Sequence, residues 1–242
     1  MFSTPKVNFA LTSVRYMGDG MTPGQAERQL ILTYAPARRR DALAALLALD
    51  DALARLLATT SEPALGQIRL QWWREALQRL DSTPPPAEPV LEALAESVLP
   101  TGVSGAGLAG IVDGWDVLIE SEQLDAEALE KFAKGRGETL FVLAGTALGA
   151  RTGDPLADAG RGWALADLSR HLDRAGEAES ARDMAARYLE QAKRARWSAN
   201  MRALGGMALL ARRDLALPRG VEPPVGSPAR LARLLWHRIS GR

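Results

Sequence analysis

Apolar residues recur every three or four positions along most of the chain, which is the spacing that places them on one face of an α-helix. Runs of Val, Ile and Thr at alternate positions, which would indicate strands, are absent. The clearest helical stripe lies within residues 37–58 and consists of Leu43, Leu46, Leu47, Leu53 and Leu57. The sequence therefore predicts an all-α protein, and its 242 residues are enough for a sizeable core in one domain or two small ones.

The chain divides into three parts. Residues 1–24 form an N-terminal arm, residues 25–217 form the helical domain, and residues 218–242 hold a Pro- and Gly-rich linker followed by a short helix. Consecutive prolines in the stretch DSTPPPAEP break the helical pattern, but this stretch is short enough to be a loop inside one domain. Gly135 and Gly137 are expected to separate two helices. Helices are expected at about residues 23–34, 37–58, 63–80, 90–98, 106–122, 126–134, 138–148, 156–172, 178–199, 201–215 and 228–239.

The absence of cysteine excludes several kinds of site, namely disulfides, thiolate zinc sites and cysteine nucleophiles. His171 and His237 are the two histidines, and they lie far apart in the sequence, so a histidine-based metal centre would need carboxylates to complete it. The N-terminal residues lack the continuous apolar core of a secretory signal. The most apolar stretch, residues 139–150, has 12 residues and is too short to span a bilayer. We therefore expect a cytoplasmic protein.

The C-terminal quarter of the chain is basic and the rest is acidic. From residue 182 to the end, 13 Lys and Arg stand against 4 Asp and Glu, a net charge of +9, whereas residues 1–181 carry −8. Such an asymmetry is typical either of an anionic partner or of a solvated helical face. The final segment, SPARLARLLWHRISGR, predicts a basic amphipathic helix that contacts an anionic membrane or a partner, or packs on its own bundle. In the membrane interpretation the contact is made by Arg230, Arg233, Trp236 and Arg238.

Asp50 is an acidic residue inside the apolar stripe of residues 37–58. Burying a carboxylate is costly unless it is paired or hydrogen-bonded, so Asp50 is either a cavity acid with a function or one half of a structural ion pair. Arg69, in the next predicted helix, is the partner that we expect in the second case. The Arg69 guanidinium also lies within reach of the rings of Trp72 and Trp73, and it could stack on Trp73 or bind a phosphate instead.

Four segments share the pattern of one protein family. The most specific is LGQIRLQWWREAL at 65–77, and it is supported by LILTYAPARRRDALAALLALD at 30–50. Two further segments are DAEALEKFAKGRGETLFVLAGTALG at 125–149 and GRGWALADLSRHLDRAGEA at 160–178. Over residues 25–215 the chain resembles the squalene/phytoene synthase family, whose members join two prenyl diphosphates head to head. The resemblance implies a single-domain, isoprenoid-synthase-like helical bundle around a central cavity.

Catalytic members of that family carry two aspartate-rich motifs of the DxxxD type on facing helices. The spacing places both carboxylates of a motif on one helical face, where they hold Mg²⁺ ions that bridge to the substrate diphosphates. The positions of this chain that align with the motif aspartates hold other residues, Ala54, Arg55 and Ala58 in the first motif and His171 and Ala175 in the second. Both motifs are degenerate in this alignment. The combination resembles a non-catalytic branch of the family, typified by mitochondrial factors that assist assembly of respiratory complex I.

From this resemblance we expect a non-catalytic binding or assembly factor that needs no cofactor. The alternative is an active prenyltransferase, which would require Mg²⁺ held by unconventional ligands, namely Asp50, Asp167 and Asp173. Another alternative is an isoprenoid lipid carrier. Arg69 and Arg170 are the candidates for binding a diphosphate or a lipid head group, and structural ion pairing is the competing interpretation for both. We expect a protein partner or an isoprenoid ligand, a cytoplasmic location with peripheral contact to the inner membrane as an option, and no nucleic acid.

Overall fold

The structure is a computed structural model that describes residues 23–60 and 62–242. Within these residues every regular element is a helix, which confirms the predicted all-α class. The α-helices are α1 (Pro23–Leu32), α2 (Arg40–Ala58), α3 (Pro63–Arg79), α4 (Pro89–Ser97), α5 (Gly105–Glu120), α6 (Ala126–Phe132), α7 (Thr139–Leu148), α8 (Leu156–His171), α9 (Ala175–Ala192), α10 (Arg202–Leu215) and α11 (Pro228–Ser240). Short 3₁₀ turns lie at Ala37–Arg39, Leu99–Thr101 and Ala199–Met201, and a π-helical turn, Ala133–Glu138, joins α6 to α7.

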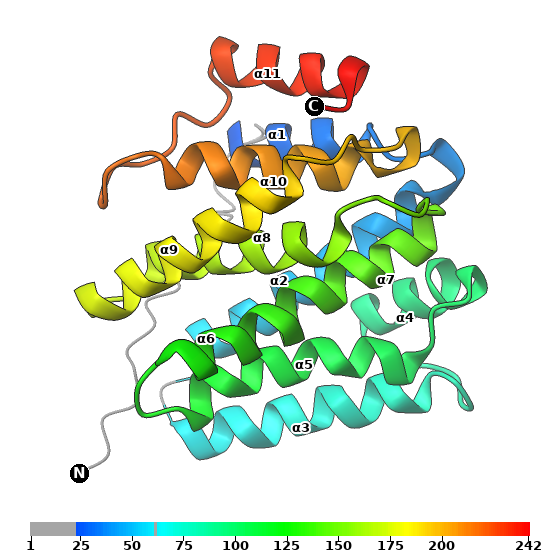
Figure 1. Cartoon of the computed structure of the whole chain (residues 1–242). Coiled ribbons are helices and arrows are strands. Elements are labelled where there is room, and N and C mark those ends of the chain that lie inside the picture. Colours follow the sequence, from blue (N-terminus) through cyan, green and yellow to red (C-terminus); the bar gives the residue numbers. More distant parts are fainter. Residues whose placement is uncertain (1–22, 61) are drawn as a thin grey trace.

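Helix α8 lies in the middle of the bundle (Figure 1). It packs against α9, α10, α7 and the π-helical turn. Helices α3 and α5 pack side by side along one edge of the molecule, and α11 lies along the opposite edge, on α10 (Figure 1). Helix α1 also packs on α10, so the first and the last described helices share a neighbour. The bundle is therefore built around α8, which contributes residues to the site described below.

The predicted leucine stripe of α2 faces the core. Its buried members are Leu43, Leu46, Leu47 and Leu53, and Leu57 packs at the margin of the core. Asp50 lies among them and exposes 4% of its surface. The periodicity of the sequence thus located both the apolar face of α2 and the acidic residue within it.

The predicted helix break at Gly135 and Gly137 is wrong. Both glycines lie in the π-helical turn, inside a helical run that continues from α6 to α7 without a loop. A Cβ atom on Gly135 would lie 2.6 Å from the Cα atom of Gly114 in α5, and a Cβ atom on Gly137 would collide with the carbonyl group of Gly160 in α8. These glycines serve a close approach of backbones rather than the end of a helix.

Helix α9 ends earlier than the sequence predicts. The expected helix reached residue 199, whereas α9 ends at Ala192. The backbone N–H and the hydroxyl group of Ser198 both donate to the carboxylate of Asp154, at 2.7 Å each. This attachment to the segment before α8 fixes an irregular connection between α9 and α10, and the periodicity of the sequence contains no sign of it.

The structure describes the C-terminal end of the chain but not residues 1–22. Most of the predicted arm, residues 1–22, lies outside the described residues, and α1 begins directly after it. The predicted C-terminal helix is α11, and it packs on the bundle through Leu234 and His237, which are buried. None of the helices in the described part of the chain is long and apolar enough to cross a membrane.

Arg230, the first arginine of α11, does not make the predicted membrane contact. It is 5% exposed, its Nε atom donates to Glu27 at 2.6 Å, and its Nη2 atom donates to Asp214 at 2.8 Å. Burial opposes the charged form, but the two carboxylates outweigh it and raise the pKa of Arg230. Arg230 therefore ties α11 to α1 and α10, while Arg233, Trp236 and Arg238 are exposed.

Candidate functional site

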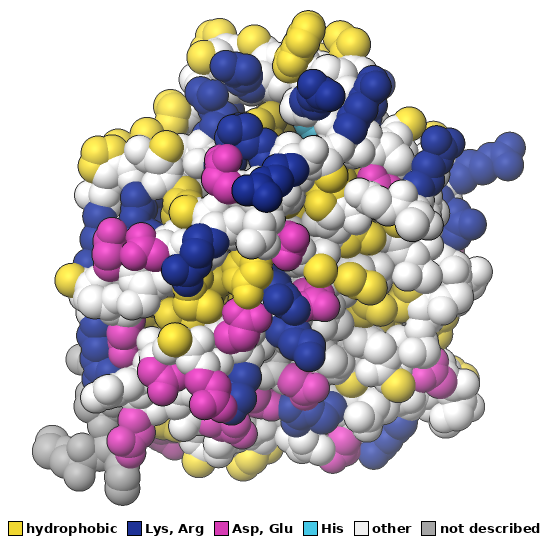
Figure 2. All heavy atoms as spheres, in the orientation of Figure 1, with side chains coloured by type: hydrophobic (Ala, Val, Ile, Leu, Met, Phe, Trp, Pro, Cys, Tyr) yellow, Lys and Arg dark blue, Asp and Glu magenta, His cyan; other side chains and the backbone are white. Residues whose placement is uncertain are grey.

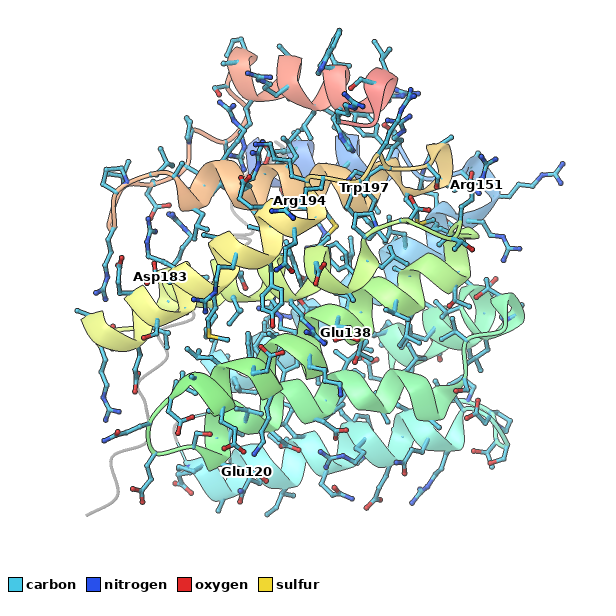
Figure 3. All side chains as sticks on the ribbon, viewed as in Figure 1. Glu120, Glu138, Arg151, Asp183, Arg194 and Trp197 are labelled. Carbon is cyan, nitrogen blue, oxygen red and sulfur yellow. The ribbon has the colours of Figure 1, made fainter. Side chains whose placement is uncertain are left out.

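Arg136 is the centre of the candidate site. It lies in the π-helical turn, whose sequence AKGRGE places a glycine on each side of it. Because these glycines let the turn approach α5 and α8 closely, the Arg136 side chain begins between the two helices and is only 3% exposed. The same turn ends at Glu138, which faces α8 and accepts a hydrogen bond from Arg161 Nε at 2.7 Å (Figure 3). Such turns are rare and occur frequently at functional sites.

The Arg136 guanidinium joins two acidic residues from different helices. Its Nε and Nη2 atoms donate to the two carboxylate oxygens of Asp50 in α2, at 2.9 Å and 2.8 Å. Its Nη1 atom donates to the Oδ2 atom of Asp167 in α8, at 2.6 Å. The Oδ1 atom of Asp50 also accepts from the indole Nε1 of Trp115, at 3.2 Å. The bidentate geometry is the strong form of an arginine–carboxylate pair.

Aromatic rings surround this ion pair. The central carbon of the guanidinium lies 4.4 Å from the ring centroid of Trp115 and 4.7 Å from that of Trp163. Phe132 lies farther away, at 5.7 Å. Indole faces attract a cation, and they also exclude water, which strengthens the charge interactions between them. The site is therefore a cluster of one cation and two carboxylates in an aromatic setting.

The protonation states follow from the geometry. Burial disfavours a charged Arg136, but the charges of Asp50 and Asp167 outweigh this effect and raise its pKa. Burial also acts to raise the pKa of Asp167, but the Arg136 guanidinium, with His171 beside it, holds that pKa below its ordinary value. Asp167 thus carries its charge at neutral pH.

A cavity of about 250 Å³ adjoins the ion pair. It lies between α1, α2, α8, α10 and α11, and each carboxylate that lines it has an arginine partner. Besides Asp50 and Asp167, which bind Arg136, Asp51 pairs with Arg28 at 2.8 Å, and Glu27 and Asp214 pair with Arg230. Burial nevertheless raises the pKa of Asp51, against the effect of Arg28. Five carboxylates thus share three arginine partners, so the chain itself offsets most of the negative charge around the cavity.

These carboxylates do not fit a Mg²⁺ site. Mg²⁺ requires oxygen ligands in near-octahedral geometry, and the oxygens of Asp50 already accept from Arg136 and Trp115. The positive charge of Arg136 lies between Asp50 and Asp167, where a cation would otherwise be attracted. Asp173 is exposed beyond the end of α8. Among residues 23–60 and 62–242 no three His, Asp or Glu side chains are placed to hold a metal ion together.

Arg69 lies apart from this cluster. It is exposed on α3, and its Nη1 atom donates to the hydroxyl group of Thr60 at 3.0 Å. The predicted pairing of Asp50 with Arg69 is therefore wrong, because Arg136 takes that place. Arg69 instead lines a cleft of about 380 Å³ between α2 and α3, together with Arg55, Trp72 and Trp73.

Arg170 lines the cavity from α8. Its Nη2 atom donates to the backbone carbonyl of Val221 at 3.1 Å and lies 3.9 Å from a carboxylate oxygen of Glu222. Both contacts are made with the segment that leads from α10 to α11. Arg170 thus has structural contacts next to the cavity, and a role in binding a diphosphate or lipid head group stays a prediction.

Sequence reasoning missed Arg136 and the ring of Trp163. One signal could have pointed to the arginine, since a buried carboxylate at Asp50 requires a cation. A second signal is the position of Arg136 between two glycines, which allow backbones to approach each other closely. The pairing itself is tertiary and leaves no periodic mark.

Comparison with known proteins gives a family and a fold. The family model described as squalene/phytoene synthase matches residues 22–240. The chain is also similar to a crystal structure described as a dehydrosqualene synthase in complex with ligand, with a TM-score of 0.68 and 16% sequence identity, covering 88% of this chain and 90% of that chain. At this identity the likeness concerns the fold, which is the predicted all-α isoprenoid synthase fold. None of the curated protein sequences matches the chain.

Proposed function

Because the chain belongs to the squalene/phytoene synthase family, which matches nearly all of the described residues, we propose that it is a non-catalytic member that acts as a binding or assembly factor. The observation that carries this proposal is the contact of Arg136 with Asp50 and Asp167. These are the acids on α2 and α8 that an active prenyltransferase of this sequence would need as metal ligands.

The chemistry of prenyl diphosphates explains why this contact matters. When the carbon–oxygen bond to the diphosphate breaks, negative charge develops on the leaving group, and cations must stabilise it. Arg136 cannot supply that charge from its observed position, because Nε, Nη1 and Nη2 all donate to the chain's own carboxylates. Withdrawing Arg136 would leave the buried charge of Asp50 unpaired, at a cost of about 3–5 kcal/mol.

The size of the adjoining cavity supports the same proposal. Its volume of about 250 Å³ is below the range of roughly 300–1,000 Å³ that is usual for pockets holding one small molecule. Head-to-head condensation would require space for two prenyl chains. The close contacts of Gly135 with Gly114 and of Gly137 with Gly160 leave no open space between the π-helical turn and helices α5 and α8.

An assembly role would use the surface of the bundle. Helix α3 exposes Leu65, Ile68 and Trp72 to 47%, 67% and 46%, at helical spacing. Apolar side chains gathered in this way are typical of protein–protein contact sites. We place the protein in the cytoplasm, in the role of the respiratory complex I assembly factors that it resembles, and α3 is the face that we assign to a protein partner.

Turnover measurements test the proposal directly. The folded full chain is incubated with farnesyl or geranylgeranyl diphosphate, with Mg²⁺ or EDTA, and with or without NADPH, and pyrophosphate and hydrocarbon products are measured. We expect no metal-dependent product. Release of pyrophosphate that requires Mg²⁺, is lost in Asp50→Asn and Asp167→Asn, and persists in the surface control Asp113→Asn would establish an active prenyltransferase instead.

A second candidate, an isoprenoid carrier, is favoured by the cleft between α2 and α3. Arg55 and Arg69 could hold an anionic head group there, while Trp72 and Trp73 offer apolar surface to a chain. The test is mass spectrometry of lipids extracted from the purified protein. An isoprenoid phosphate that disappears in Arg69→Gln, but not in the exposed control Arg79→Gln, would select this candidate over an assembly factor.

A further inference from the structure

Helix α11 packs one face against the bundle and leaves the opposite face exposed. Arg230, Leu234 and His237 are buried at 5%, 0% and 1% exposure. The opposite face consists of exposed residues at the spacing i, i+3, i+4 and i+7, which are Ala232, Leu235, Trp236 and Ile239. The three large members of this outer stripe are 49%, 60% and 75% exposed. An apolar stripe of this kind on the outer side of a helix calls for a covering partner.

The inner face fixes α11 in place, so the outer stripe cannot turn inward. Arg230 binds Glu27 in α1 and Asp214 in α10. His237 lies within hydrogen-bond distance of the backbone carbonyl of Arg202, at 3.1 Å, and the Arg202 side chain donates to the carbonyl of His237. These contacts hold α11 along the edge of the bundle, where Figure 1 shows it.

The charge around the stripe is positive. Residues 228–242 contain four arginines and no acidic residue. At 100° per residue, Arg233 and Arg238 fall on opposite sides of the outer stripe, and both are exposed. Arg196 adds a further cation at the end of the helix, where it donates to the carbonyl of Ser240 at 2.8 Å. In Figure 2 arginine and lysine side chains gather around α11, whereas acidic side chains gather at the other end of the molecule.

We propose that α11 docks the protein on an anionic lipid bilayer. Leu235, Trp236 and Ile239 enter the boundary between head groups and acyl chains, and the flanking arginines contact lipid phosphates. A tryptophan with its amphipathic ring is suited to this depth, and basic residues on both sides of an apolar stripe are typical of helices that lie in the interface plane. This inference rests on α11 alone and does not depend on the absence of catalysis.

The shape of the ridge favours a bilayer over a protein groove. Stable protein interfaces bury about 1,200–2,000 Å² in total, whereas α11 offers three large apolar side chains on a convex edge. The half of the helix that would complete a helix-in-groove contact is already used by the bundle. A flat anionic surface can meet both the stripe and the arginines beside it without a shaped partner.

Vesicle co-sedimentation with the full chain tests this inference. We expect binding to vesicles of phosphatidylcholine with phosphatidylglycerol, weaker binding at high salt, and little binding to phosphatidylcholine alone. The variant Trp236→Ser/Ile239→Ser should lose at least about tenfold in partitioning. Its control is Val142→Ser on α7, where the side chain is 40% exposed, and it should bind as the wild type does.

The charge contribution has its own variants. Arg233→Gln should weaken binding about fivefold, which corresponds to ~1 kcal/mol per basic residue near an anionic surface, while Arg79→Gln on α3 should leave it unchanged. Deleting residues 218–242 would be a poor test, because it removes Arg230 and leaves Glu27 and Asp214 without their partner.

Three results would overturn the proposal. The first is a failure of the wild type to sediment with anionic vesicles at low salt. The second is equal loss of binding in the α11 double variant and in the control Val142→Ser. The third is a dimer in the absence of lipid that Trp236→Ser/Ile239→Ser converts to a monomer, since the stripe would then cover a second copy of the chain. Ile239→Ser alone, at the most exposed of the three positions, repeats the test with the smallest change.

Discussion

The guanidinium of Arg136 meets the carboxylate of Asp50 at two points, although the two residues lie 86 positions apart in the sequence. Helix α2 contributes the carboxylate and the π-helical turn contributes the cation, so the contact joins the first half of the bundle to the second. Asp167 extends it to α8. The cluster therefore connects the three elements that enclose the middle of the molecule.

The substitution Arg136→Met should be strongly destabilising. It removes the cation but leaves the buried carboxylate of Asp50 uncompensated, so we expect the free energy of unfolding to fall by about 3–5 kcal/mol. Urea denaturation measures this change. The double variant Arg136→Met/Asp50→Leu should recover part of the loss, because the buried charge goes with its partner. The exposed control Arg79→Met should stay within about 0.5 kcal/mol of the wild type, and an equally small effect of Arg136→Met would contradict our account.

The close approach of the π-helical turn to α8 predicts a contrast between two glycines. Gly137→Ala should lower the free energy of unfolding by about 1–3 kcal/mol, because the new methyl group collides with the carbonyl of Gly160. At Gly176, in α9, no atom lies within 4 Å of the position that a methyl group would take, so Gly176→Ala should raise it by about 0.4–1 kcal/mol. Thermal melts of both variants check the prediction, and equal shifts would refute the steric explanation.

The lowered pKa of Asp167 leads us to expect that the protein loses stability in acid. Its folded pKa lies below the ordinary value of 3.8 because of Arg136, so its contribution to stability is complete above 3.8 and is lost as the pH falls through the lower folded pKa. The difference in unfolding free energy between the wild type and Asp167→Asn should therefore shrink between about pH 5 and pH 2.5. Urea denaturation of both proteins at several pH values in this interval measures the difference. A difference that stays constant over that interval would show that Asp167 is not held in the ion pair.

The buried His237 leads us to expect a second effect of pH, a local loss of stability in α11 at lower pH. Burial lowers its folded pKa below 6.5, so the neutral ring is the stable form, and its contribution is complete above 6.5 and declines as the pH falls toward the folded pKa. Hydrogen exchange of the α11 amides should accelerate between about pH 8 and pH 5.5, after correction for the intrinsic rate, and this acceleration should disappear in His237→Gln. The variant His171→Gln keeps His237 and should retain it.

The sequence predicted the fold because the fold depends on local periodicity. The stripe of α2 and the proline breaks follow from the spacing of single residues, and the family resemblance supplied their arrangement. What periodicity missed were contacts between distant segments. The early end of α9 depends on Ser198 meeting Asp154, and the continuous run from α6 to α7 depends on Gly135 meeting Gly114.

The candidate site was predicted in part. The position of Asp50 in an apolar stripe indicated a buried acid in need of a partner, which the structure has. Arg69 is not the partner, because the cation that meets Asp50 comes from a distant turn and not from the next helix in the sequence. Arg230 is buried for a related reason, since its partner Glu27 lies 203 positions away and the helical pattern of α11 carries no sign of it.

Arg136 also determines what the middle of the protein needs from its surroundings. A metal ion exchanges with the solution and can be removed by a chelator, but a guanidinium is attached to the backbone and arrives with the polypeptide. The pairing of Asp50 and Asp167 with Arg136 therefore forms as the chain folds. In this chain the cation between the two buried acids is part of the polypeptide itself.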